Sequence, residues 1–324
     1  MAESQLNRAE WRLQPLFSKL LISAAFLFLA SDASNERPNR TPGPDRVTSL
    51  QFEPVELGRQ ASGAVRVTGA WRLQADDDRL FGLSALAILP GGRLQSVTDS
   101  GVLVTFDRPG GGPNALVSDL PGGPGYPTFK KYRDSEAMVV EPAGDRLIAF
   151  ENRHSLWRYR ANGSAAAVRV AMPSARWKKN TGIEAMVRNP ADGSLLLLHE
   201  GGRQVLRYTG SPMADILPLE GATGGVADAA VLPDGRIVVA VREIGLLGLT
   251  NRLAWLERTG RGYRLRPFAT LPLGALDNVE GLAAERQAGG TTLLWAITDN
   301  DGWRRSLLLR IELDTTKAPA RTGA

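Results

Sequence analysis

The chain has 324 residues, of which 43% are hydrophobic and 23% charged, as in an average soluble globular protein. This balance excludes a globally disordered or collagen-like chain, and 35 glycines with 20 prolines argue against a helical bundle. The absence of cysteine excludes disulfides, thiolate metal sites and a cysteine nucleophile, and two histidines are too few for a three-histidine zinc site. The net charge of +5 comes mainly from scattered arginines, so we expect no nucleic-acid partner.

Residues 1–33 have the features of a secretory signal peptide. Basic residues precede the stretch Leu20–Ala30, which is apolar apart from Ser23, and small residues follow it. As a helix this stretch spans about 16 Å, which is too short for a hydrocarbon core of about 30 Å, although an uncleaved membrane anchor is the alternative. Residues 34–62 are interpreted as a flexible leader. We therefore expect an exported, periplasmic protein without stable membrane insertion after cleavage.

Residues 63–314 contain a repeated pattern. Each repeat has an apolar run, a turn rich in Pro, Gly or Asp, a second apolar run and an acidic residue, and two further strand-like runs often follow, as in Gln204–Tyr208. The aligned positions are Ser84, Glu136, Glu184, Asp228 and Glu280, which gives intervals of 52, 48, 44 and 52 residues. A period of about 50 residues with about four short strands predicts an all-β fold, namely a β-propeller. Five blades are favoured, and six remain open.

The last repeat lacks one predicted strand. Only three strand-like runs follow Val279, and residues 315–324 are expected to be a disordered tail. The run Ala64–Leu73, which precedes the first repeat, can supply the missing strand. Pairing it with the last blade closes the ring and leaves no terminal sheet edge exposed.

Acidic residues recur where each first strand starts and where each second strand ends. Antiparallel pairing places both positions on the same face of a propeller, so we expect carboxylates around one mouth of its central channel. The starts carry Glu136, Glu184, Asp228 and Glu280, and the ends carry Asp99, Glu151, Glu200, Glu243 and Asp299. Crowded carboxylates repel one another unless a cation neutralises them, and Ca²⁺ prefers oxygen ligands. The predicted metal ligands are Glu136, Glu184, Asp228, Glu280 and Asp299, and the alternative is ion pairing with arginines.

The loops after the second strands add basic residues to this mouth. Guanidinium groups suit bidentate contacts with an anionic ester, and the candidates are Arg153, Arg203, Arg242 and Arg304. Glu151 and His154 are the candidate catalytic residues, although a loop histidine bonded to the backbone is the alternative for His154. His199 is expected to be packed. No nucleophile elbow, P-loop or dinucleotide-binding motif is present, so we expect no organic cofactor.

Several short motifs in these repeats resemble one known family. They are Asp134-Ser-Glu136-Ala-Met, Phe150-Glu-Asn-Arg-His154, Thr181-Gly-Ile-Glu184-Ala-Met, Ala227-Asp-Ala-Ala230, Asp277-Asn-Val-Glu280-Gly-Leu and Thr298-Asp-Asn-Asp301. Together, over about residues 70–313, they resemble the secreted "esterase-like activity of phytase" family. The resemblance implies a β-propeller with phosphatase or esterase activity, and it carries no agreed catalytic residues.

Two functions of different classes follow from these observations. In the first, the acids bind Ca²⁺, the arginines bind a small anionic ester, and a water activated by the cation hydrolyses it. In the second, the same face of a non-catalytic propeller binds a ligand or a partner protein, and its acids are engaged in ion pairs. The fold alone does not choose between them, because propellers include enzymes and scaffolds. The sequence makes no prediction of the oligomeric state.

Overall fold

The computed structural model describes residues 39–58, 61–62, 64–161, 163, 166–172, 177–178, 181–210, 215–287, 289–299 and 305–315. The predicted signal peptide, Arg304 and nearly all of the predicted tail lie outside this part of the chain. The described elements are strands, apart from the 3₁₀ turn η2 (Asp78–Leu80) and the one-turn helix α2 (Lys130–Arg133). No helix in the described part is long and apolar enough to span a bilayer. The prediction of an all-β fold is confirmed.

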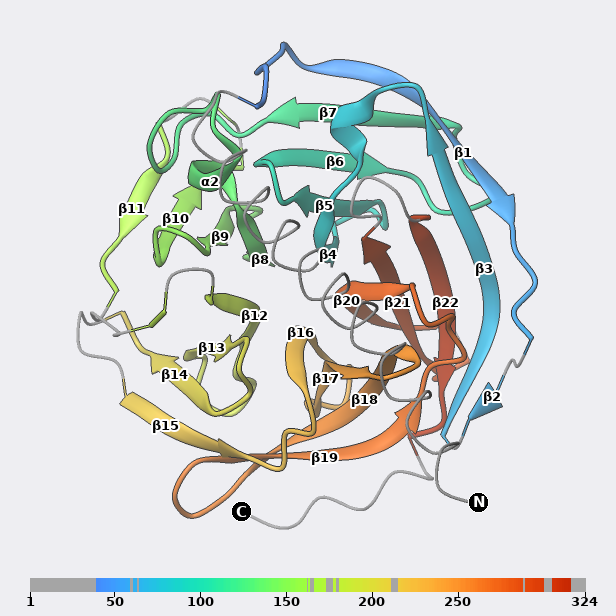
Figure 1. The fold of residues 1–324 in the computed structure, drawn as a ribbon, viewed down its shortest axis with the longest axis vertical. Coiled ribbons are helices and arrows are strands. Elements are labelled where there is room, and N and C mark those ends of the chain that lie inside the picture. Colours follow the sequence, from blue (N-terminus) through green and yellow to red (C-terminus); the bar gives the residue numbers. More distant parts are fainter. Residues whose placement is uncertain are drawn as a thin grey trace, which may run out of the picture.

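The strands form successive antiparallel meanders, arranged in a ring (Figure 1). Unit 1 is β4 (Leu83–Ile88), β5 (Leu94–Thr98), β6 (Val102–Phe106) and β7 (Asn114–Asp119), and unit 2 is β8 (Ser135–Val140), β9 (Arg146–Phe150), β10 (Ser155–Tyr159) and β11 (Val168–Val170). Unit 3 is β12 (Ile183–Arg188), β13 (Leu195–His199), β14 (Gln204–Tyr208) and β15 (Asp215–Glu220). Unit 4 is β16 (Gly225–Val231), β17 (Ile237–Gly245), β18 (Gly248–Arg258) and β19 (Tyr263–Thr270), and unit 5 contains β20 (Asn278–Arg286), β21 (Thr292–Asp299) and β22 (Leu307–Leu313).

The first strands of the units surround the centre of the ring (Figure 1). In chain order, β4, β8, β12, β16 and β20 each contact the next, and β20 also contacts β4. Because each meander runs outward from its first strand, this arrangement is that of a β-propeller. It also brings the same end of every first strand to one face of the molecule.

The N-terminal strands connect the sheets of units 5 and 1. Strand β3 (Val65–Ala75), to which the short β2 (Ala61–Ser62) is added, pairs antiparallel with β22. Strand β1 (Arg46–Pro54) pairs with both β3 and β7, although its residues were expected to belong to a flexible leader. The strand is difficult to recognise because its sequence is mostly polar and only Thr48 and Leu50 are buried. A parallel pair, β15 with β19, similarly joins units 3 and 4.

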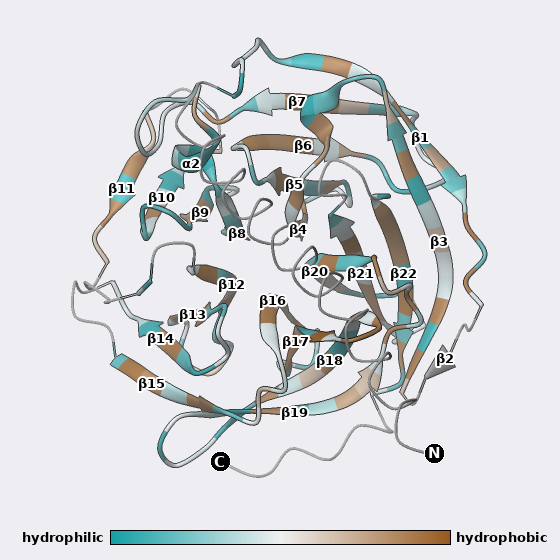
Figure 2. Cartoon of the chain, viewed as in Figure 1, coloured by the Kyte–Doolittle hydropathy of each residue, from teal (hydrophilic) through white to brown (hydrophobic). Residues whose placement is uncertain are grey.

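The hydrophobic core lies between neighbouring units rather than in the centre of the ring. Successive side chains of a strand point to opposite faces, so an inner strand that is buried on both faces reads as a continuous apolar run. In β13, Leu195 and Leu197 pack toward unit 2, and Leu196 and Leu198 pack toward unit 4. Figure 2 shows the same apolar character along β21 and β22. This stacking fixes the first strands against one another and thereby positions the residues at their ends.

Candidate functional site

A β-bulge recurs near the start of every first strand. The register of each ladder shifts at one residue, which is left without a partner on the second strand. The bulged residues are Ser84, Glu136, Glu184, Ala227 and Glu280. On each second strand, one residue pairs with the residue that precedes the bulge. The next residues along these strands are Asp99, Glu151, Glu200, Arg242 and Asp299. Because a bulge redirects a side chain, these two sets of positions define the mouth of the ring.

Unit 4 differs from the predicted alignment by one residue. Val226 pairs with Val241 as Ile183 pairs with His199 in unit 3, so the equivalent mouth positions are Ala227 and Arg242. The sequence alignment had placed Asp228 and Glu243 there. The shift was hidden because the run around Asp228 consists mainly of alanines, which show no alternation between faces. Unit 4 therefore contributes a cation to the mouth where two acids were expected.

The carboxylate of Asp228 lies among the first strands instead. Its Oδ2 accepts a hydrogen bond of 2.6 Å from the backbone N–H of Leu282 in unit 5, and backbone N–H groups of Ala229 and Leu86 also donate to it. Burial raises the pKa of Asp228 well above its usual range, against the effect of these backbone donors. Asp228 thus connects the first strands of units 4, 5 and 1.

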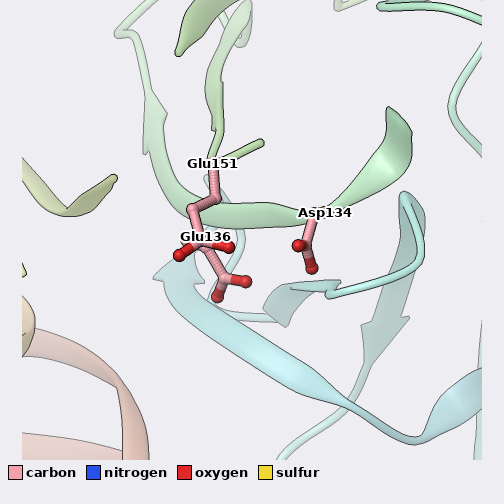
Figure 3. Close-up of side chains that lie close together, drawn as sticks. All are labelled: Asp134, Glu136 and Glu151. Atoms are coloured by element: carbon pink, nitrogen blue, oxygen red, sulfur yellow. The ribbon is translucent and has the colours of Figure 1, made fainter. Parts of the chain in front are cut away.

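Five other carboxylates form two overlapping triplets in units 2 and 3. The first triplet is Asp134, Glu136 and Glu151, and the second is Glu151, Glu184 and Glu200. In each triplet one oxygen per residue lies within 4.8 Å of the others, and Figure 3 shows the first triplet, with Glu136 and Glu151 side by side. Two oxygens bound at about 2.4 Å to one cation are at most about 4.8 Å apart, so the spacing of each triplet is compatible with one metal ion. Glu151 belongs to both.

A glycine permits this close approach between units 2 and 3. An ideal Cβ at Gly182 would lie 2.8 Å from Cγ of Glu151, closer than side chains tolerate. Equivalent backbone hydrogen bonds fix Glu151 in unit 2 and Glu200 in unit 3. The N–H of Glu151 donates to the carbonyl of Asp134 (2.8 Å), and the N–H of Glu200 donates to the carbonyl of Gly182 (3.0 Å). Gly182 is therefore a condition for placing Glu151 beside the start of β12.

The carboxylates are protonated more readily than usual in this environment. Burial, and then the negative charge of Asp134, raise the pKa of Glu151 to about 8. Burial also raises the pKa of Glu136 and Glu184 well above the usual range, and repulsion from neighbouring carboxylates adds to the effect. Without a cation, the folded chain therefore pays electrostatic free energy to hold these groups ionised.

Two cations among the described residues partly offset this charge. Lys130 Nζ lies 2.5 Å from Oδ2 of Asp99, and Arg242 forms an ion pair with Glu280 and lies 3.6 Å from Glu200. Burial opposes the charge on Arg242, but the surrounding carboxylates, Glu280 first, raise its pKa above the usual value. Neither triplet in the described part of the chain includes Glu280, Asp228 or Asp299.

The remaining predicted residues lie around this cluster. Arg153 and Arg203 are exposed, and the guanidinium of Arg153 lies 4.3 Å from the ring centre of Tyr132. His154 has a positive φ of 40° and packs edge-on against Trp177, which in turn contacts His199. The side chain of His154 forms a hydrogen bond with the backbone of Lys178. Burial lowers the pKa of both His154 and His199.

Sequence reasoning did not name Asp134 or Glu200 among the candidate metal ligands, although both belong to the triplets. Asp134 lies two residues before a bulge, where the other units have Gly82, Gly182, Gly225 and Asn278. An acid at this position in unit 2 alone is a signal that a comparison of the repeats could have used. Glu151 was predicted as a catalytic residue, and the structure places it where the two triplets meet.

The fold and this mouth define a β-propeller with a cluster of carboxylates at one end of its channel. Residues 55–302 match the family described as "Phytase-like: Esterase-like activity of phytase". The chain belongs to this family. No curated protein sequence matches the chain.

Several solved structures resemble the fold at low sequence identity. A PQQ-bound aldose sugar dehydrogenase from Streptomyces coelicolor is 14% identical, with a TM-score of 0.47 and coverage of 84% of this chain and 99% of that one. A virginiamycin B lyase from Staphylococcus aureus is 10% identical, with a TM-score of 0.43 and coverage of 82% and 99%. A gluconolactonase from Xanthomonas campestris is 14% identical, with a TM-score of 0.43 and coverage of 85% and 99%.

Proposed function

We propose that this chain is an exported, periplasmic hydrolase of phosphate or carboxylic esters that uses Ca²⁺ at the mouth of its propeller. We also propose a ring of five blades closed by β3, which is supported by the pairing of β3 with β22 and by the contact of β20 with β4. Membership of the phytase-like family supports an enzymatic role.

The observation that carries the proposal is the pair of carboxylate triplets sharing Glu151. The donor set consists of hard oxygen atoms, and its spacing suits Ca²⁺. Burial, and then repulsion from neighbouring carboxylates, raise the pKa of Glu136 and Glu184, so holding them ionised without a further cation is unfavourable. A bound Ca²⁺ would neutralise the ionised carboxylates, polarise an ester oxygen and increase the acidity of water.

The other residues at the mouth have distinct roles in the proposal. Arg153 and Arg203 are exposed beside the triplets and attract an anionic ester. Arg242 fixes Glu200 and Glu280 through its ion pairs. Burial lowers the pKa of His154, which favours its neutral form, and a neutral imidazole can accept a proton.

A non-catalytic, ligand-binding propeller is the second candidate. It is favoured by the ion pairs that Lys130 and Arg242 already form with the acids. Under this hypothesis the same face binds a ligand or protein without hydrolysis.

Calorimetric titration with Ca²⁺ and hydrolysis assays distinguish the two functions. The assays use an aryl phosphate and a short-chain aryl ester, with Glu184→Gln as the test variant. Glu220→Gln is the control, because Glu220 is exposed on β15 and pairs with Arg264. Loss of Ca²⁺ binding and of hydrolysis in the test variant alone supports the hydrolase. Retained Ca²⁺ binding in a wild type without hydrolysis supports the second candidate, and a wild type that does not bind Ca²⁺ refutes the metal site.

A further inference from the structure

The hairpin between β17 and β18 extends further than its counterpart in unit 3. Beyond the pair Val241–Arg252, the ladder continues through four more pairs to Gly245–Gly248. In unit 3 the corresponding ladder ends at Leu198–Val205. At about 3.4 Å per residue, four pairs carry the tip about 14 Å beyond Val241, on the side of the mouth.

The tip of this hairpin is apolar and almost completely exposed. Leu246 and Leu247 form its two-residue turn, with relative exposures of 107% and 94%, and Ile244 is 83% exposed. Such turns usually contain Asn, Asp or Gly, so two leucines there serve neither the turn nor the core. We call Ile244, Leu246 and Leu247 the apolar finger.

A neighbouring loop extends the apolar surface. The backbone N–H of Leu249 donates to the carbonyl of Ala275 at 2.8 Å, which holds the loop against the hairpin. The next residue, Leu276, is 54% exposed. The other large exposed hydrophobic side chains among the described residues are dispersed over β1, β11, β15 and a loop of unit 1, at Val47, Val168, Ile216 and Tyr126. A concentration of this kind marks an interaction surface.

Three exposed cations lie on one side of the same mouth, in the loops of units 2 and 3. Arg153 and Arg203 follow the second strands of units 2 and 3, and Lys178, which is also exposed, provides the backbone contact of His154. The chain as a whole carries a net charge of +5. Anionic lipid headgroups attract such groups, and apolar side chains can insert between the acyl chains below them.

We propose that the apolar finger docks this face of the propeller on an anionic lipid surface. A bilayer accepts a convex apolar tip without a preformed pocket, whereas a protein partner would need a matching groove. The pairing of Gly245 with Gly248 limits the number of backbone groups that insertion would leave without partners. The docking is peripheral, because the finger is far too short to span a bilayer. The inference concerns a surface and does not depend on hydrolysis at the mouth.

The absence of native cysteine allows a direct test. In the full-length chain, Leu246→Cys carries an environment-sensitive fluorophore, and Ile216→Cys on β15 carries the same fluorophore as the matched control. Vesicles contain phosphatidylcholine alone or with phosphatidylglycerol. We expect a blue shift and at least a doubling of emission at position 246 with the anionic vesicles, and no change at position 216. Because each fluorophore reports its own position, attachment through another part of the chain does not imitate this result.

A second variant measures the contribution of the leucines. In vesicle flotation, Leu246→Ser combined with Leu247→Ser should weaken binding at least about tenfold, whereas Val168→Ser combined with Ile216→Ser should not. Both pairs are exposed, so the melting temperatures should remain equal to that of the wild type. An unchanged fluorophore at position 246 overturns the proposal. A blue shift that appears without vesicles when the protein concentration is raised also overturns the proposal. In that case a second copy of the chain, rather than lipid, would cover the finger.

Discussion

Removing the charge of Glu151 should stabilise the protein when Ca²⁺ is chelated, and only at alkaline pH. The pKa of Glu151 is raised to about 8 in the folded chain, from an ordinary value near 4.5. An acid whose pKa is raised by folding binds protons more tightly in the folded state, so its contribution to stability is lost as pH rises from about 4.5 to about 8. The Glu151→Gln variant keeps a neutral side chain of similar shape and escapes this loss.

The shift sets the size of the expected effect. Without solvent screening, a rise of this extent changes the free energy of unfolding by about 5 kcal/mol. The side chain is partly exposed, so screening reduces the expected change to about 2 kcal/mol. For a domain of this size, that difference changes the melting temperature by about 4–8 °C. With chelator at about pH 8.5, the melting temperature of Glu151→Gln should exceed that of the wild type by this amount. At about pH 5 the two melting temperatures should agree within about 2 °C.

Thermal melts at several pH values, with chelator and with Ca²⁺, provide the measurement. The lowered pKa of His154 and His199 acts in the opposite direction near pH 6.5, but it is common to both proteins and cancels in their difference. Ca²⁺ should reverse the order at alkaline pH, because only the wild type keeps the shared ligand. If Glu151→Gln melts below the wild type in chelator at alkaline pH, the electrostatic account of the triplets is refuted.

Two further substitutions separate the mouth from the core beneath it. Gly182→Ala should cost about 1–3 kcal/mol and weaken Ca²⁺ binding at least about fivefold, because its Cβ displaces Glu151. Gly260→Ala, which meets nothing within 4 Å, should change neither quantity, and equal effects in both variants would contradict the role of Gly182. Asp228→Ala leaves buried backbone N–H groups without an acceptor and should cost at least about 3 kcal/mol in urea unfolding. Its Ca²⁺ affinity should stay within about twofold of the wild type, and a larger loss would place Asp228 in the metal site.

The sequence predicted the repeat well where turns and apolar runs coincide. The run Gln204–Tyr208 is a strand with the same bounds in the structure, because β-branched and aliphatic residues there are bracketed by glycines. Strand β1 was missed, since a polar edge strand has little hydrophobic pattern. The mouth positions of unit 4 were misplaced by one residue because a bulge changes the register without leaving a sign in the composition. Asp134 was missed because only positions that carry an acid in most units were considered, and the other units have glycine or asparagine at its position.

The corrected register also changes where a cation should bind. A ring with acids from every unit would concentrate negative potential on its axis. Arg242 stands at the mouth position of unit 4 and neutralises Glu280 from unit 5, and Lys130 engages Asp99 from unit 1. In units 2 and 3, where both triplets lie, the compensation is weaker, because Arg242 reaches only Glu200 there, at 3.6 Å. The electrostatics thus favour a cation between these two units, away from the axis, with Glu151 as the ligand that either position would use.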